Sequence, residues 1–240
     1  MVFTVIIPCY NSEKWISECL LSALNQTYEN TEVVFVDNES TDFSMKIAQN
    51  IQKDYPNLVI STAPNIYRHS YQEPVEKALS LSKGDFFTIL GSDDFLDENY
   101  VENIVNILNK SSKILALQSP IRGIRGSEKV LTGDLSHNYQ SLREFKQLLF
   151  KKCPVTTPSI VLKKSLYDEG IVRWNSEDYL GASDYDLYFN LADKNIFIYP
   201  FPKWCGYYYR WHDDQSTWGM HKENKNYDSL IKNFWKQKWT

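Results

Sequence analysis

The sequence predicts an α/β fold with a Rossmann-like, mostly parallel central sheet flanked by helices, and an irregular second half. Short apolar runs rich in β-branched residues alternate with segments in which apolar residues recur at helical spacing. This alternation favours parallel strands joined by right-handed crossovers. The chain has 240 residues, of which 42% are hydrophobic, so it can bury a substantial core as one large domain.

The first half contains the regular part of this pattern. Its first strand spans 3–7 and is expected to stop at Pro8, because proline cannot donate a ladder hydrogen bond. Further strands are expected at 32–36, 58–61, 86–90 and 114–118, each an apolar run too short for a helix. Amphipathic helices are expected between them, at 13–24, 42–54, 71–82 and 99–109.

The pattern becomes irregular after Gln118. Gly123, Gly126 and Gly133 interrupt a stretch that predicts a loop or hairpin. Helices are expected at 141–152 and 184–192, and strands at 159–162, 195–199 and 203–210, the last of which is an aromatic run. No linker-like stretch is present, so we expect one continuous domain over 1–217, followed by a helical extension over 218–240.

Composition excludes several classes of function. The net charge of −4 gives no support for nucleic-acid binding, which usually shows as a basic patch. The four cysteines have no C-x-x-C spacing, so neither a zinc site nor a disulfide framework is indicated. The first residues lack the basic segment of a signal peptide, and no apolar run is long enough to span a membrane. We therefore expect reduced thiols and a cytoplasmic protein.

Two adjacent carboxylates follow the strand at 86–90. Asp93 and Asp94 come directly after Gly91 and Ser92, at the strand end where open α/β sheets bind their ligands. Neighbouring carboxylates repel each other, and a divalent cation that also holds substrate phosphates would join them. The alternative is that one of them caps the helix that begins near Asp97.

Two further acidic sites end or begin predicted elements. Asp37 ends the second strand and therefore faces the same edge of the sheet as the acidic pair. It can accept a hydrogen bond from a nucleobase or ribose, or it can cap the helix that follows, and on its own the cap is favoured. Asp184 and Asp186 open a late helix.

Five motifs, taken in order, resemble those of family 2 glycosyltransferases with the GT-A fold. They lie at 5–11, 36–42, 92–94, 183–192 and 207–212, with Ser216 beyond the last. Each motif alone is weak, but five in this order at plausible spacing make a specific signal. The resemblance covers residues 3–217.

The resemblance implies an inverting, metal-dependent transfer of a sugar from a nucleotide-diphosphate donor, most commonly UDP, to a hydroxyl of a glycan or glycolipid, in polysaccharide or glycoconjugate synthesis. Residues 1–118 would form the nucleotide-sugar half and 119–217 the acceptor half. The implied nucleotide-binding residues are Pro8, Tyr10, Asn11, Asp37, Ser92 and Asp93. The implied ligands of Mn²⁺ or Mg²⁺ are Asp93, Asp94 and His212, and the implied general base is Asp184.

These assignments agree with the chemistry of the reaction and leave alternatives open. A cation neutralises the charge that develops on the leaving diphosphate, and a carboxylate within reach makes an acceptor hydroxyl nucleophilic. Glu177 and Asp178 compete with Asp184 for the role of base, but Asp184 is favoured because it lies in the first turn of an amphipathic helix. His212 could instead be a structural histidine, since histidine serves many roles.

The chain departs from the family pattern at two places. Gly91 stands where the family commonly has another aspartate, so one expected donor contact is missing. The segment between 65 and 84 has Glu73-Pro74-Val75 in place of the usual small and basic residues.

Two other functions compete with sugar transfer. A nucleotidyltransferase would favour a glycine-rich, basic phosphate loop after the first strand, and residues 8–11 do not form one. A catalytically inactive, sugar-binding relative is conceivable because of Gly91, since fold does not fix function. The presence of Asp93, Asp94 and Asp184 together argues against it.

The C-terminal segment 222–239 allows two interpretations. Its aromatic and aliphatic residues alternate with lysines, as in a helix that lies on the inner face of a membrane. The favoured alternative is that the aromatic face packs onto the domain, because amphipathic helices usually face a core. No feature of the sequence predicts the oligomeric state.

Overall fold

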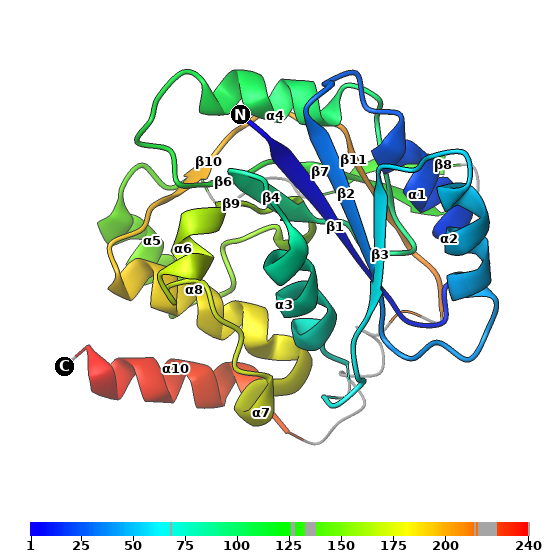
Figure 1. Cartoon of the computed structure of the whole chain (residues 1–240). Coiled ribbons are helices and arrows are strands. Elements are labelled where there is room, and N and C mark those ends of the chain that lie inside the picture. The colour runs from blue at the N-terminus through cyan, green and yellow to red at the C-terminus, as the bar shows by residue number, and fades with distance from the viewer. Residues whose placement is uncertain (68, 126–127, 133–137, 214, 216–224, 240) are drawn as a thin grey trace.

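The computed structural model describes residues 1–67, 69–125, 128–132, 138–213, 215 and 225–239, and it is built on a seven-stranded sheet (Figure 1). The strand order is β10-β6-β9-β4-β1-β2-β3. The strands are β1 Phe3–Cys9, β2 Thr31–Asp37, β3 Leu58–Thr62, β4 Phe86–Ile89, β6 Ala116–Gln118, β9 Val161–Lys163 and β10 Ile198–Pro200. Among these described strands, β9 alone runs antiparallel to its neighbours. The predicted mostly parallel α/β sheet is confirmed.

Helices cover both faces of this sheet, because successive side chains of each strand point to opposite faces. Val5, Ile7 and Phe35 pack on one face with α1, α2 and α4. Ile6 and Val34 pack on the other face with α3, α5, α8 and α10. The helices are α1 Ile16–Leu24, α2 Ser44–Gln52, α3 Gln72–Leu81, α4 Tyr100–Leu108, α5 Leu142–Leu149, α6 Lys164–Asp168, α7 Ser176–Tyr179, α8 Ser183–Asp193 and α10 Tyr227–Lys238. Short 3₁₀ turns lie at Thr157–Ser159 and Leu180–Ala182.

A second sheet, which the sequence did not predict, joins distant parts of the chain. Its four strands follow the order β5-β11-β7-β8. They are β5 Phe95–Leu96, β7 Ile121–Arg125, β8 Glu128–Thr132 and β11 Tyr207–Arg210. The stretch predicted as a loop or hairpin is the antiparallel pair of β7 and β8. Because β5 follows the acidic pair directly and β11 pairs with it, this small sheet brings the end of the domain to the end of β4.

The first strand extends past its predicted end. Pro8 lies within β1, which continues to Cys9. Pairing with β4 ends at Ile6, so at Pro8 the strand has a partner only in β2. A proline is tolerated at such a one-sided position because fewer ladder hydrogen bonds are required of it.

The C-terminal helix packs its aromatic face onto the domain, as the favoured interpretation predicted. Tyr227, Ile231 and Trp235 of α10 are buried, and the Trp235 ring stacks on Phe189 of α8 with ring centroids 5.8 Å apart. Residues 218–224 and 240 of the predicted helical extension lie outside the described part of the chain. Among the described helices, none combines the length and apolarity that crossing a membrane requires.

Candidate active site

A large cleft, with a volume of about 730 Å³, opens where β1 and β4 end. It lies between the loops that follow these strands, the start of α8 and the end of β11. Every predicted site residue except Asp37 lines it, namely Pro8, Tyr10, Asn11, Ser92, Asp93, Asp94, Asp184 and His212. Open α/β sheets bind their ligands at this edge. Ser216 lies outside the described residues.

The loop after β1 is fixed to the loop after β2. The side-chain oxygen of Asn11 accepts a hydrogen bond of 2.8 Å from the backbone N–H of Thr41. The backbone N–H of Asn11 donates a hydrogen bond to the Ser40 hydroxyl. The side chain of Asn11 is therefore already engaged in holding these two loops together. Tyr10 is 53% exposed at the cleft, which leaves an aromatic face open to a ligand.

Asp37 caps the loop after β2 and not the helix that follows, because α2 begins only at Ser44. Its Oδ2 accepts a hydrogen bond of 3.0 Å from the backbone N–H of Ser40, so the carboxylate caps the loop. Its Oδ1 is buried and has no hydrogen-bond partner among the described residues. A buried acceptor without a partner costs free energy that a ligand donor would recover. Asp37 itself does not line the cleft, but the adjacent Asn38 does.

The acidic pair is divided between two environments. Asp94 is buried, and its two oxygens accept hydrogen bonds from the Tyr207 hydroxyl (2.8 Å) and the Arg210 backbone N–H (2.7 Å). Burial, and then the charge of Asp93, raises the pKa of the Asp94 carboxyl. Asp93 is partly exposed, and its Oδ2 lies 2.9 Å from Nε2 of His212. Asp94 thus ties β11 to the end of β4, whereas Asp93 and His212 present a carboxylate and an imidazole to the cleft.

Gly91 is where both carboxylates approach the backbone. A Cβ atom at this position would lie 2.9 Å from Oδ1 of Asp93 and 2.9 Å from Oδ2 of Asp94. Such distances are shorter than a van der Waals contact allows. The departure from the family pattern at Gly91 therefore permits the present arrangement of the pair.

Arg210 is a residue of this site to which the sequence assigned no role of its own. Its Nε donates to the backbone carbonyl of Asp93 (2.8 Å), and its guanidinium lies 4.4 Å from the ring centroid of Trp15 and pairs with Glu18. The ring of His212 lies 5.7 Å from the same tryptophan. The motif at 207–212 contained the signal, but only the structure shows that Arg210 holds the turn that carries Asp93.

Asp184 lies in the first turn of α8 on another wall of the cleft. Its Oδ2 accepts a hydrogen bond of 2.9 Å from the Thr157 hydroxyl, which accepts one in turn from Tyr188. The pKa of Asp184 is raised to about 6, chiefly by burial and to a smaller extent by the negative charge of Asp228, while the Thr157 hydrogen bond lowers it in part. The carboxylate is therefore largely ionised at neutral pH and more basic than an ordinary aspartate.

The neighbouring acids lie elsewhere. Asp186 is buried in the core, where it accepts a 2.6 Å hydrogen bond from Trp235 and lies 3.6 Å from the Arg173 guanidinium. Glu177 and Asp178 belong to α7 and do not line the cleft, and Asp178 accepts a hydrogen bond from Asn175.

The residues at the cleft fit a cation that arrives with a ligand better than a preformed metal centre. No three His, Cys, Asp or Glu side chains of the described residues are grouped to hold a metal ion. Asp93 and His212 nevertheless offer one oxygen and one nitrogen ligand at the cleft. Mg²⁺ in particular is often bound through one or two carboxylates, with substrate phosphates and water completing its ligands.

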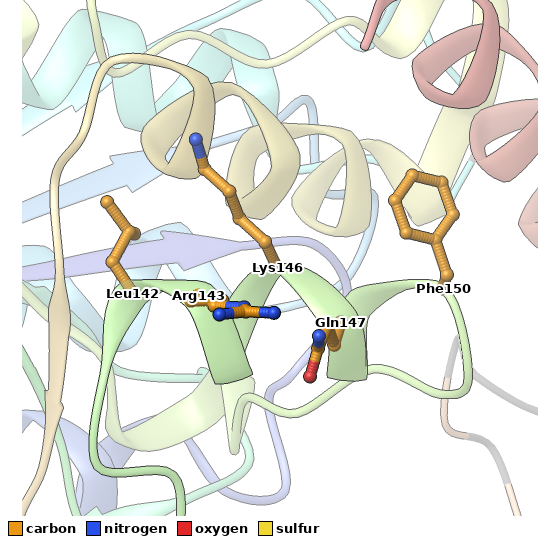
Figure 2. Close-up of a pocket in the computed structure, with 5 residues that line it drawn as sticks. All are labelled: Leu142, Arg143, Lys146, Gln147 and Phe150. Atoms are coloured by element: carbon orange, nitrogen blue, oxygen red, sulfur yellow. The ribbon is translucent and has the colours of Figure 1, made fainter. Parts of the chain in front are cut away.

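A smaller hollow on the surface of α5 has no such chemistry. Figure 2 shows its lining, and its volume is about 370 Å³. The residues are Leu142, Arg143, Lys146, Gln147 and Phe150. It contains no acidic residue and lies apart from the predicted site residues, so we do not treat it as an active site.

The crystal structure of S. aureus TarS 1-349 in complex with UDP-GlcNAc superposes with a TM-score of 0.73 and 22% identity, covering 90% of this chain and 61% of that one. The fold is GT-A. The model of the family "Glycosyl transferase family 2" matches residues 4–170. The chain belongs to glycosyltransferase family 2.

Two curated relatives agree with this family. An uncharacterized glycosyltransferase of Haemophilus influenzae is 28% identical over 192 residues, which are 77% of this chain and 58% of that protein. The poly(ribitol-phosphate) beta-glucosyltransferase of Bacillus spizizenii is 32% identical over 128 residues, which are 52% of this chain and 20% of that protein. The chain thus spans less than two thirds of the length of either relative.

Proposed function

We propose that this protein is an inverting glycosyltransferase that moves a sugar from a UDP-sugar to a hydroxyl of a glycan or glycolipid, in polysaccharide or glycoconjugate synthesis. One observation carries the proposal. A single cleft presents the Asp93–His212 pair near the end of β4 and the basic carboxylate of Asp184 at the start of α8. A diphosphate donor requires ligands for a cation, and a hydroxyl acceptor requires a base, and both kinds of group must line the same cleft.

The loops after β1 and β2 would bind the nucleotide. Tyr10 offers an exposed ring for the base, and the buried Oδ1 of Asp37 offers an acceptor for an N–H or O–H of the base or ribose. Pro8 and Asn11 would shape this end of the cleft, and Ser92, whose hydroxyl lies 2.6 Å from that of Ser12, would close it beside the acidic pair.

Asp184 would act as the general base. Its Oδ1 or Oδ2 takes the proton of the acceptor hydroxyl while that oxygen forms a bond to the anomeric carbon of the donor sugar. The bond from this carbon to the diphosphate oxygen breaks on the opposite side, and its electron pair leaves with UDP. The anomeric configuration is therefore inverted. Thr157 holds the carboxylate in position through its hydroxyl, which donates to Oδ2.

The protein would use Mn²⁺ or Mg²⁺ together with the donor. Asp93 and His212 would hold the ion, and Asp94 would support them from behind, since both of its oxygens already accept hydrogen bonds. When bound, such an ion neutralises the charge that develops on the leaving diphosphate.

The domain organisation and the location of the protein are part of the same proposal. Residues 1–118 would bind the nucleotide sugar, 119–217 the acceptor, and 218–240 would form an extension of this domain in the cytoplasm. Leu230 and Phe234, four residues apart on α10, are 43% and 48% exposed and share one face of the helix. This outer face could touch the inner face of a membrane, which sedimentation with anionic vesicles at low salt would detect.

A screen of nucleotide sugars tests the proposal. The unfolding temperature should rise with UDP or a UDP-sugar in the presence of Mn²⁺ and much less without it, because a ligand that binds only the folded state stabilises it. Transfer to simple glycosides is then measured with the donor that stabilises most. Attachment of uridine monophosphate to an acceptor, with release of sugar phosphate from a UDP-sugar or of diphosphate from added UTP, would instead indicate a nucleotidyltransferase. Donor binding without transfer or hydrolysis would indicate an inactive sugar-binding relative.

A further inference from the structure

The C-terminal helix contributes a charged side chain to the cleft. Asp228, in the first turn of α10, is exposed and lines the same cleft as Asp184, Cys153 and Thr157. It lies beyond residues 4–170, which the family model matches. The start of α10 therefore forms part of the cleft wall near the proposed base.

The position of this side chain is fixed by the packing of its helix. Trp235 donates to the buried Asp186 (2.6 Å), and Trp239 donates to Asp193 (2.9 Å), so two indole N–H groups tie α10 to α8. At the other end, the Asn226 side chain caps the helix by accepting from the N–H of Ser229 (3.0 Å). Asp228 lies between this cap and the buried Ile231, on a turn that is held at both ends.

The surroundings of Asp184 are acidic. Asp228 from α10 adds a negative charge that raises the pKa of Asp184. The other titratable groups that interact with Asp184 are Tyr71 before α3, Tyr188 of α8 and Cys153, and burial raises the pKa of each, so they are uncharged at neutral pH. Lys232 follows Asp228 by one turn of α10 but does not line the cleft: its Nζ donates to the Lys151 carbonyl (3.4 Å) and lies 5.6 Å from the ring centroid of Tyr185. His69 also lines the cleft. Among the described residues that line the cleft, the sole lysine or arginine is Lys14, in the loop after β1.

We propose that Asp228 is an acceptor-specificity residue, which accepts a hydrogen bond from the sugar bound beside Asp184 and selects a ring without an anionic group. This inference rests on the proposed function, because it needs an acceptor at that end of the cleft. Two carboxylates at an end of the cleft that no lysine or arginine of the described residues lines attract hydroxyl or ammonium donors. They repel a carboxylate or phosphate on the same ring.

The test compares Asp228→Asn with Asp178→Asn, a matched substitution of an exposed aspartate outside the cleft. Transfer is measured to a neutral methyl hexoside and to the corresponding methyl hexuronide, with the UDP-sugar found in the screen. Wild type and Asp178→Asn should strongly prefer the neutral acceptor. Asp228→Asn should raise the KM for the neutral acceptor about 10-fold, as expected for losing a hydrogen bond to a charged group. It should also lower the ratio of transfer to the neutral hexoside over transfer to the hexuronide. The donor KM should not change.

The pH profile separates this role from a merely structural one. Transfer by the wild type should fall below a pH of about 6 as Asp184 becomes protonated. Removing the negative charge of Asp228 favours the ionised form of Asp184, so the acidic limb should move to lower pH in Asp228→Asn and stay in place in Asp178→Asn. If Asp228→Asn matches the wild type in acceptor preference and pH profile, this inference is wrong while the proposed function stands. A wild type that transfers to no acceptor overturns both.

Discussion

The first half (1–118) and the second half (119–217) supply groups to one cleft by different structural means. In the first half, Pro8 lies near the end of β1 and Asp93 follows the end of β4, which pairs with β1 in parallel, so the register of these strands fixes where the two residues lie. In the second half, Asp184 begins a helix and His212 follows a strand of a separate small sheet. The second set depends on contacts between distant residues, so we expect it to be the more sensitive to changes far from the cleft.

The largest effect is expected at the base. Asp184→Asn should lower the transfer rate by about 10²–10⁴-fold, because the amide keeps the size of the side chain but cannot take a proton at neutral pH. UDP affinity should remain close to that of the wild type, since Asp184 begins α8 and is separate from the proposed nucleotide-binding residues after β1, β2 and β4. Single-turnover transfer and calorimetry of UDP binding measure the two effects separately.

The neighbouring acids serve as controls for this prediction. Asp178→Asn should retain transfer, because Asp178 does not line the cleft. Asp186→Asn should lower the stability of the fold and affect transfer only for that reason, because Asp186 is buried and hydrogen-bonded to Trp235. If Asp184→Asn keeps substantial activity while one of the control variants is folded but inactive, the second half contributes a different base.

The same contrast explains what the sequence could predict. The apolar residues of the first half recur at the spacing of strands or helices, so these elements could be predicted. Asp37 and Asp93 lie at or just after the ends of predicted strands, so the edge of the sheet that carries them could be predicted as well. The antiparallel insertion of β9 and the pairing of β5 with β11 could not, because they depend on contacts between residues more than 70 positions apart.

The different environments of Asp93 and Asp94 have the same cause. Adjacent in sequence, the two carboxylates have the same local pattern. Only the Tyr207 hydroxyl and the Arg210 backbone, which come from the far end of the domain, assign Asp94 to the interior. Likewise, the aromatic run at 203–210 predicted a strand, but the sequence did not indicate which strand it pairs with. The hydrogen bond from Arg210 to the Asp93 carbonyl could therefore not be predicted.

The second prediction concerns the support of the second half. Trp235→Ala should lower the free energy of unfolding by about 3–5 kcal/mol, because it removes a fully buried ring and leaves Asp186 without its indole partner. Denaturant unfolding measures the change. Phe234→Ala is the matched control, since this neighbouring ring is 48% exposed and should cost far less. Equal losses in both variants would show that α10 is not anchored through Trp235.

The third prediction distinguishes the roles of Asp93 and Asp94, the acidic pair of the first half that contacts β11 and His212 of the second half. Asp93→Asn should weaken Mn²⁺-dependent UDP binding at least about 10-fold with little change in stability, because a charged ligand at the cleft is lost. Asp94→Asn should also lower the free energy of unfolding by about 1–3 kcal/mol, because one amide cannot accept hydrogen bonds from both the Tyr207 hydroxyl and the Arg210 N–H. Calorimetry and denaturant unfolding of both variants distinguish them. Identical behaviour would mean that the pair acts as one unit.

The smallest effect is expected where the first half departs from its family. Gly91→Asp supplies the acid that the family commonly has there, yet it should weaken UDP binding several-fold. The new Cβ would lie 2.9 Å from an oxygen of each carboxylate, and Asp94 cannot move without losing Tyr207 and Arg210. Asp93 must therefore turn away from His212, and a third negative charge adds repulsion. Gly91→Ala introduces the Cβ without the charge, so the difference between the two variants in calorimetry isolates the electrostatic part. Tighter UDP binding by Gly91→Asp would show that the pair can rearrange, and that Gly91 limits donor binding in this chain.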